Sequence, residues 1–219
     1  PDAAEVNFDL LPMEHIQRIE LLSGTGSLLG PNSLGGAINL ITRRGQGPPG
    51  GHLEVSGGSF DDWSGEGNLA GATKRGLSYY AAGGYERENG WREATSARNH
   101  NGFLNLGKSG RRSGLSFQAF GAKSKANSAG SLPESIFDVD PQSNFTPGDF
   151  EDLDILQAAA HGYAAVGPNR LSFSLYHRRT NAERFNVNQV PDNNVRSFTN
   201  NRSVGATADW RWATPLGSG

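Results

Sequence analysis

The sequence of 219 residues contains no cysteine. Without thiols the chain has no disulfide framework, and neither a metal site nor a catalytic nucleophile can be built from cysteine. It also lacks any run of about 18 apolar residues, the length with which an α-helix crosses a bilayer. No signal peptide is visible and the first residue is Pro1, so we interpret the sequence as a part of a longer protein.

An excess of charge of one sign is missing as well. The 20 Lys and Arg nearly balance the 22 Asp and Glu, and a net charge of −2 gives no electrostatic footprint for nucleic acid. Apolar residues make up only 35% of the chain, and the mean hydropathy is −0.54. These values favour long loops or thin walls with one apolar face. The 30 glycines, about twice the usual share of ~7%, are spread through patterned segments, which argues against simple disorder.

The segment Leu11–Arg44, called the head below, differs from the rest of the chain. Two apolar runs, Arg18–Leu22 and Ala37–Thr42, predict β-strands, and a glycine-rich loop separates them. The stretch Pro12–Arg18 predicts a short helical turn, because proline suits the first position of a helix. The head is therefore expected to be a small unit with both helix and strand.

The glycine-rich loop carries Gly24, Gly26 and Gly30 directly after a predicted strand. Such a spacing can belong to a dinucleotide-binding turn, provided that a helix begins inside the glycines. Pro31 and the pair Gly35–Gly36 leave no room for that helix. We therefore interpret these glycines as supplying positive φ angles and close backbone approach in a loop.

The head resembles the end of the plug domain of TonB-dependent outer-membrane receptors. That family combines a strand of the pattern I-x-R-I-E-V, a loop G-P-x-S-x-x-Y-G and a strand G-G-x-I-N-I-I-T-K/R. The matching positions in this sequence are Ile16–Leu22, Gly24, Ser27, Gly30 and Leu34–Arg43. About thirty residues match with few gaps, which is far more specific than a glycine motif alone.

Two positions depart from the family pattern. Thr25 stands where the loop usually has proline, and Leu29 stands where it usually has the tyrosine that in some members reaches the ligand. Contact with ligand at this loop apex is therefore expected to be apolar or absent. The resemblance makes the apex residues candidates for ligand binding, namely Ser27, Leu28, Leu29 and Asn32.

The chain after the head alternates apolar and polar residues in segments of the length of transmembrane barrel strands, ~9–11 residues. Leu171, Phe173 and Leu175, for example, alternate with serine and tyrosine. Asp209 and Arg211 lie on the polar side of such a segment, where a dry core could not hold them without partners. Eight strands are expected, at 51–59, 62–72, 77–87, 99–109, 114–125, 156–166, 170–183 and 201–212.

The connections between these strands alternate in length, as in outer-membrane barrels with short periplasmic turns and long outer loops. Short connections span 73–76, 110–113 and 167–169, and longer ones span 88–98, 126–155 and 184–200. The first hairpin, at 59–61, is an exception. Trp210 and Trp212 lie beside an expected periplasmic turn, where an aromatic girdle belongs.

The sequence thus predicts an all-β fold, a portion of an antiparallel transmembrane β-barrel preceded by the C-terminal part of a small α+β plug. The boundary is expected near residue 48, with the plug part in 1–48 and the barrel part in 49–219. An antiparallel sandwich remains the alternative. A closed eight-stranded barrel leaves no room for a plug, since plugged transporters have about 22 strands. Open edges are therefore expected at 51–59 and 201–212.

No catalytic constellation is present, and the chain is not expected to be an enzyme. The five histidines lack the spacing of metal ligands, and no nucleophile-elbow motif occurs; they are His15, His52, His100, His161 and His177.

The segment 126–155 is rich in acidic residues and has no Lys or Arg. Hard oxygen ligands suit Ca²⁺, so a calcium site is one hypothesis, and a solvated, extended loop is the other. The candidate ligands are Asp138, Asp140, Glu151 and Asp152. No other cofactor is expected.

The resemblance also implies contacts between plug and barrel, for which Arg18, Glu20, Glu66 and Arg87 are candidates. Aromatic residues in or beside the expected outer loops could form a vestibule for a bulky solute. Those assigned to ligand binding are Trp91, Phe137, Phe145 and Phe185.

The resemblance implies a receptor in the outer membrane of a Gram-negative cell. It would take up a scarce solute such as an iron–siderophore complex or cobalamin, energised by the TonB–ExbB–ExbD complex, and lipid or lipopolysaccharide would surround it. The composition and periodicity alone support only an outer-membrane β-barrel. A passive or structural barrel, such as a porin or adhesin, and a soluble β-sandwich binding module are the competing hypotheses.

Overall fold

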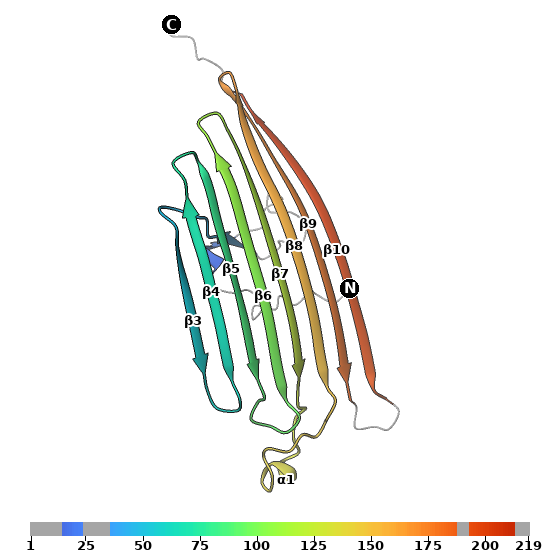
Figure 1. The fold of residues 1–219 in the computed structure, drawn as a ribbon. Coiled ribbons are helices and arrows are strands. Elements are labelled where there is room, and N and C mark those ends of the chain that lie inside the picture. The colour runs from blue at the N-terminus through green and yellow to red at the C-terminus, as the bar shows by residue number, and fades with distance from the viewer. Residues whose placement is uncertain (1–14, 24–35, 188–192, 213–219) are drawn as a thin grey trace.

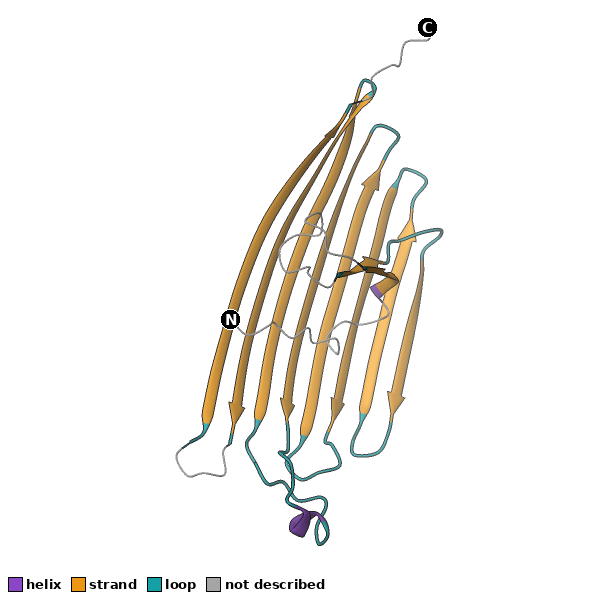
Figure 2. Cartoon of the chain, turned by 180° about the vertical axis from the view of Figure 1, so that it is seen from behind, coloured by secondary structure: helices purple, strands orange, loops and turns teal. Residues whose placement is uncertain are grey.

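The computed structural model describes residues 15–23, 36–187 and 193–212. They form an eight-stranded sheet and a two-stranded head that lies on one face of it. Figure 1 shows the sheet with the head behind it, and Figure 2 shows the head in front of the sheet. We call the face that carries the head the inner face, and the opposite face the outer face.

The head consists of β1 (Ile16–Leu22) and β2 (Ala37–Thr42), which pair antiparallel. This confirms the two strands expected from the apolar runs. The helical turn expected over 12–18 is wrong for residues 16–18, because their backbone pairs with the end of β2 instead. The first part of that segment lies outside the described residues.

The large sheet is an antiparallel meander in which each strand pairs with its neighbours in the chain. Its order runs from β10 to β3 without closure, so β3 and β10 are open edges, as the sequence predicts. The strands are β3 (Gly50–Gly57), β4 (Trp63–Ala72), β5 (Leu77–Glu88), β6 (Ser96–Ser109), β7 (Ser113–Asn127), β8 (Phe150–Val166), β9 (Asn169–Asn186) and β10 (Val195–Arg211).

Several strands are longer than the sequence pattern predicts, mainly at the end that carries the longer loops. The expected starts at 156 and 201 are wrong, since β8 begins at Phe150 and β10 at Val195. The apolar alternation stops where the side chains become polar, but the hydrogen-bonded ladder continues through the polar residues. The acidic segment is therefore partly strand, and only 128–149 connects β7 to β8.

That connection contains the short helix α1 (Glu134–Phe137). Among the described residues, no helix is long and apolar enough to cross a membrane. The helix and the longer loops lie at one end of the sheet, and the short turns lie at the other end (Figure 1).

The outer face of the sheet is apolar and exposed. Strand register places most of the large exposed apolar side chains of the sheet on this face, in rows that cross neighbouring strands. An exposed apolar surface of this extent indicates a partner or a membrane. The residues include Leu53, Leu69, Leu77, Leu106, Leu115, Phe117, Leu156, Leu171, Phe173, Leu175, Val204 and Trp210.

The inner face carries mostly polar side chains. Its apolar residues lie where the head covers it and in a cluster formed by Ala122, Leu153, Phe120, Ile155 and Ala182. Phe103 and Asn105 alternate with Leu104 and Leu106 along β6, and only the first pair is buried. The alternation expected from the sequence is thus present, with the buried positions explained by contact with the head.

Candidate functional site

The contact between the head and the inner face is built around His15. Its ring stacks on Phe103 of β6, with ring centroids 5.2 Å apart and 23° between the ring planes. The edge of the same ring meets Tyr80 of β5 at a centroid distance of 6.3 Å. His15 retains only 4% of its accessible surface. The residue that precedes β1 is therefore held in an aromatic pocket on the inner face of the sheet, which we also call the wall.

Polar contacts fix the second strand of the head to the same part of the wall. Thr42 Oγ1 donates a hydrogen bond of 3.1 Å to Gln118 Oε1 on β7. The amide of Asn105, which is 4% exposed, donates a bond of 3.3 Å to the carbonyl oxygen of Arg43. The buried asparagine thus has a partner, and the contact joins the head to two neighbouring strands.

Gly45 lies where the chain passes from the head to the sheet. A Cβ atom at this position would collide with the carbonyl oxygens of Gly71 and Tyr79. The backbone therefore approaches β4 and β5 more closely than any other residue type allows.

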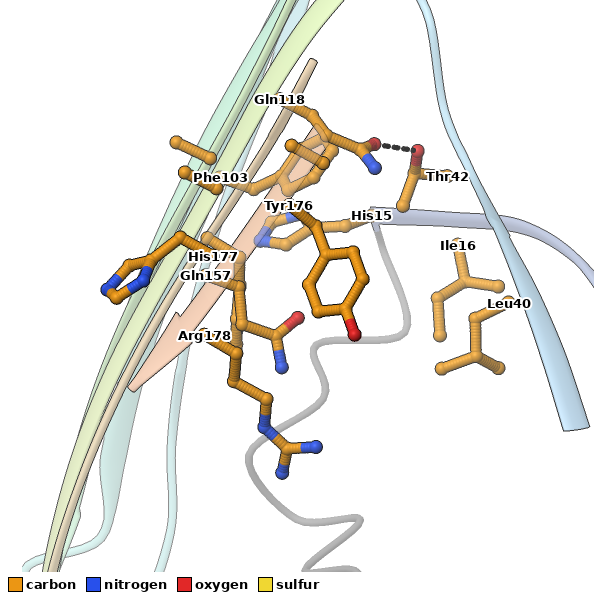
Figure 3. A pocket seen from close by; sticks show the side chains of 14 residues that line it. His15, Ile16, Leu40, Thr42, Phe103, Gln118, Gln157, Tyr176, His177 and Arg178 are labelled. Carbon is orange, nitrogen blue, oxygen red and sulfur yellow. Dashed lines mark hydrogen bonds between the residues drawn. The ribbon is translucent and has the colours of Figure 1, made fainter. Parts of the chain in front are cut away.

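Beside these contacts a cavity of about 360 Å³ opens between the head and the inner face (Figure 3). Ile16 and Leu40 line it from the head. The wall contributes Gln157 and Arg178, and Figure 3 shows the Arg178 guanidinium on the side opposite to His177. An amide and a cation beside apolar side chains suit noncovalent contact with a polar solute or with another protein segment.

Arg92, in the connection between β5 and β6, links two of the longer loops at one end of the sheet. Its guanidinium donates to Ser143 O at 2.8 Å and 3.2 Å, to Gly130 O at 2.8 Å and to Ala129 O at 3.4 Å. The backbone N–H of Glu93 adds a bond of 2.8 Å to Gln142 O. The connections β5–β6 and β7–β8 therefore form one unit, which we call the outer cap (89–95 and 128–149).

Three of the four aromatic residues assigned to ligand binding lie on the outer cap. Trp91 and Phe137 are exposed to 48% and 55%, and Phe145 is half-buried. Phe185 lies on β9, where it stacks on Phe150 at 5.9 Å on the outer face, so the structure does not bring it to the other three. The apex residues Ser27, Leu28, Leu29 and Asn32 lie outside the described residues.

The structure places the residues expected to join plug and barrel in different surroundings. Arg18 and Glu20 pair with each other at 2.6 Å along β1. Glu66 is on the inner face and lines a small cavity with His15. Arg87 is on the outer face, where it pairs with Asp61, because the residues of a strand alternate between its two faces. Arg87 therefore does not contact the head.

The four carboxylates proposed for calcium are dispersed. Asp138 follows α1 and donates its backbone N–H to Glu134 O, and Asp140 accepts a bond from the backbone N–H of Gln142. Glu151 pairs with Arg184 on the inner face, whereas its neighbour Asp152 is on the outer face. In the described part of the chain, no group of three or more acidic or histidine side chains is arranged to hold a metal ion.

The residues that form the contact with the head were not identified from the sequence, apart from the strands that carry them. The available signal was a large aromatic residue, Phe103, on the otherwise polar side of an alternating strand. Such a residue needs cover on that side, and the head supplies it. No corresponding feature of the sequence pointed to His15.

No model of a protein family matches this chain. A rhizobactin receptor from Rhizobium meliloti (strain 1021) is 41% identical over 70 residues. The aligned part amounts to 30% of this chain and 9% of that receptor.

Two solved structures show the same fold. The ferric citrate transporter FecA in its unliganded form aligns with a TM-score of 0.71 and 17% identity, over 90% of this chain and 31% of FecA. The ferripyoverdine receptor of the outer membrane of Pseudomonas aeruginosa aligns with a TM-score of 0.66 and 18% identity, over 90% of this chain and 28% of the receptor. The chain thus spans less than a third of these proteins, whose names describe a transporter and a receptor.

Proposed function

Because this chain has the fold of the TonB-dependent siderophore receptors, of which it spans a part, we propose that it belongs to an outer-membrane receptor for energised uptake of an iron chelate. Residues 1–48 are then the end of the plug, and 49–219 the first part of the barrel wall. The observation that carries the proposal is the docking of the head on the inner face of a sheet whose outer face is apolar.

The apolar outer face supports a position in a membrane. Its exposed leucine, phenylalanine and valine side chains are suited to lipid, and the opposite face is polar, as in the wall of a wide barrel. A passive porin needs no separate two-stranded unit on the lumen side. The head therefore favours the plugged receptor over a passive or structural barrel.

The solute is proposed to be an iron chelate, since the similar receptors are named for rhizobactin, ferric citrate and ferripyoverdine. It would first meet the outer cap, where Trp91 and Phe137 offer exposed aromatic surface. The cavity beside Arg178 lies deeper on the inner face. A cation there suits chelates with a net negative charge.

The energy source is proposed to be the TonB complex acting on a plug segment that precedes the head. The described contacts of the head with the wall are few: one aromatic pocket and a small number of hydrogen bonds. Contacts of this kind hold the plug yet allow part of it to move.

The test is iron uptake by cells that produce the full-length receptor in a strain without its own copy. Accumulation of ⁵⁵Fe supplied as a rhizobactin or citrate chelate is followed with and without a protonophore. Energised transport predicts saturable uptake that the protonophore stops, while binding at the cell surface continues. Uptake that does not saturate and is the same with and without the protonophore would instead establish a passive barrel.

A further inference from the structure

The end of the sheet that carries the short turns has an excess of positive charge (Figure 1). No Asp or Glu occurs in the segments 70–79, 105–116 and 163–173, which form this end of β4 to β9. An anionic partner therefore suits this end of the sheet. Five exposed cations lie in or next to the first two of the short turns, 73–76 and 110–112, and we call them the turn cations. They are Lys74, Arg75, Lys108, Arg111 and Arg112.

The turn cations are available to an anion, whereas other cations at the same end are not. In the described part of the chain, none of the five forms an ion pair. Arg170 and Arg211 are directly opposite each other on the inner face. The Cζ atom of Arg170 lies 4.2 Å from the centroid of the Tyr163 ring, and Arg211 donates to Asp209 at 3.0 Å. These two arginines already have partners.

Backbone hydrogen bonds hold the first two short turns in place. The N–H of Ser109 donates to Gly76 O at 2.8 Å, which joins the first turn to the start of the second. Ala165 of β8 donates its N–H to Arg112 O at 2.6 Å. The centres of the turns are two strand spacings apart, about 10 Å, and the Debye length in physiological salt is about as long. The charges of the two turns therefore repel each other, and an anion between them removes this repulsion.

Lys108 connects these charges with the apolar outer face. Its side chain is on that face, directly opposite Leu77 of β5 and Leu115 of β7. The two leucines are 47% and 56% exposed. The stem of a lysine lies along apolar surface while its ammonium group reaches the polar level beside it. An anion that meets Lys108 therefore fits best as the headgroup of a molecule with apolar chains.

Trp210 marks the level of lipid headgroups at the same end of the sheet. It is on the outer face, directly opposite Leu171 and next to the last residue of β10. Tryptophan side chains gather at the boundary between the apolar and the polar part of a membrane. The turn cations therefore lie at the membrane surface and not far out in solvent.

We propose that the turn cations bind the phosphate of an anionic glycerophospholipid, a lipid whose headgroup keeps a net negative charge. The acyl chains of this lipid lie on the apolar rows that contain Leu77 and Leu115. The location of the lipid rests on the proposed function, which places the short turns on the periplasmic side and the lipid in the inner leaflet of the outer membrane.

The test uses the full-length receptor, purified in mild detergent. It is titrated with phosphatidylglycerol, with phosphatidylcholine of the same acyl chains and with inorganic phosphate, and bound molecules are counted by native mass spectrometry. Two variants each remove both cations from one turn, and a matched control removes two cations from the inner face at the same end. They are Lys74→Gln with Arg75→Gln, Arg111→Gln with Arg112→Gln and, as the control, Arg170→Gln with Arg211→Gln.

We expect wild type and control to bind phosphatidylglycerol alike. Each turn variant is expected to bind it roughly 25-fold more weakly, at about five-fold per cation. Equal affinity of the wild type for the two lipids would overturn the proposal, and so would an equal loss of binding in the control and the turn variants. Inorganic phosphate that binds as tightly as phosphatidylglycerol would also overturn it.

A variant of Lys108 separates the effect of charge from that of apolar contact. Lys108→Leu enlarges the apolar surface and removes one charge, so a lipid held by its phosphate is expected to bind about five-fold more weakly. Lys108→Arg should bind as the wild type does. Tighter binding of phosphatidylglycerol to Lys108→Leu would contradict the role of the phosphate. Binding that neither turn variant nor Lys108→Leu alters would overturn the proposal and favour a soluble acidic partner for these cations.

Uptake of ⁵⁵Fe is measured for the same variants. A receptor that binds phosphatidylglycerol as expected but takes up no iron would disprove the proposed function alone. A receptor that takes up iron and binds both lipids equally would disprove the lipid site alone.

Discussion

At the scale of single residues, the contact of head and wall depends on Phe103. The ring is 7% exposed, stacks on His15 and contacts Tyr80 at a centroid distance of 6.0 Å. The side chain of the next residue, Leu104, points to the outer face. One residue of β6 thus provides much of the apolar surface that the head covers.

Phe103→Ala is expected to weaken the docking of the head by about 3–5 kcal/mol, the usual cost of removing a buried phenylalanine. Release of the head is measured by the rate at which trypsin cleaves the full-length receptor after Arg43 and Arg44, and this rate is expected to rise in the variant. The control is Phe117→Ala, an equal truncation on the outer face of β7. Cleavage at the same rate in both variants would show that Phe103 does not hold the head.

Gly45→Ala tests the close backbone approach at the exit of the head. The added methyl group would meet the carbonyl oxygens of Gly71 and Tyr79, so the backbone must shift and the head must move from the wall. Gly50→Ala is the control, since a Cβ atom there meets nothing within 4 Å. The midpoint temperature of thermal unfolding of the receptor should fall by several degrees for Gly45→Ala and stay the same for Gly50→Ala.

Arg92 is the residue on which the outer cap depends. Hydrogen bonds to a charged group contribute about 1.5–3 kcal/mol each, so Arg92→Ala should open the connection between β7 and β8. Hydrogen exchange of residues 128–149 is expected to become faster in the variant, and exchange within β7 and β8 is expected to stay the same. Unchanged exchange of the connection would disprove the role of Arg92; Arg92→Lys, which lacks the forked donors, should resemble the alanine variant.

At the scale of elements, the strands show what periodicity can and cannot predict. Alternation over 170–175 was sufficient to predict β9, because lipid and lumen impose a period of two. It failed at Phe150–Ile155, where acidic residues interrupt the apolar pattern, although Leu153 is buried on the inner face. There the hydrogen bonds of the neighbouring strands, which a single sequence does not reveal, continue the ladder.

The two faces of β9 should respond differently to charge. Leu175→Arg places a cation among exposed apolar side chains on the outer face, at an expected cost of about 2–4 kcal/mol near the bilayer centre. Ser172→Arg places the same residue on the inner face and should cost little. The amount of folded receptor in the outer membrane, measured by resistance to heat in gel electrophoresis, distinguishes them. Equal loss for both variants would contradict the assignment of faces.

The contacts between the head and the sheet could not be predicted from the sequence. The resemblance of the head to a plug predicts contact with a β-sheet wall, and the head packs on the inner face of the sheet. It named the charged residues Arg18, Glu20, Glu66 and Arg87 as candidates. Of these, Glu66 lies beside the head and Arg87 lies on the outer face, whereas the contacts described above involve His15, Thr42 and the carbonyl oxygen of Arg43. A charge is visible in a sequence, but the face on which a neighbouring strand presents it depends on register.

At the scale of the whole molecule, the account rests on one asymmetry. The head packs on one side of the sheet, and most of the large exposed apolar side chains of the sheet lie on the other side. The open edges at β3 and β10 carry unpaired backbone groups, which further strands of the full-length protein would satisfy. The sheet is then a segment of a wall between lipid and plug.

A scan of nitroxide labels along β9 in the full-length receptor, reconstituted in lipid vesicles, tests this asymmetry most directly. The described chain contributes no cysteine of its own, so single cysteines at positions 171–176 can be labelled one at a time. We predict high accessibility to dissolved oxygen at 171, 173 and 175, where labels face lipid, and low accessibility at 172, 174 and 176. Uniform accessibility along the strand, or high oxygen accessibility at the even positions, would contradict the account.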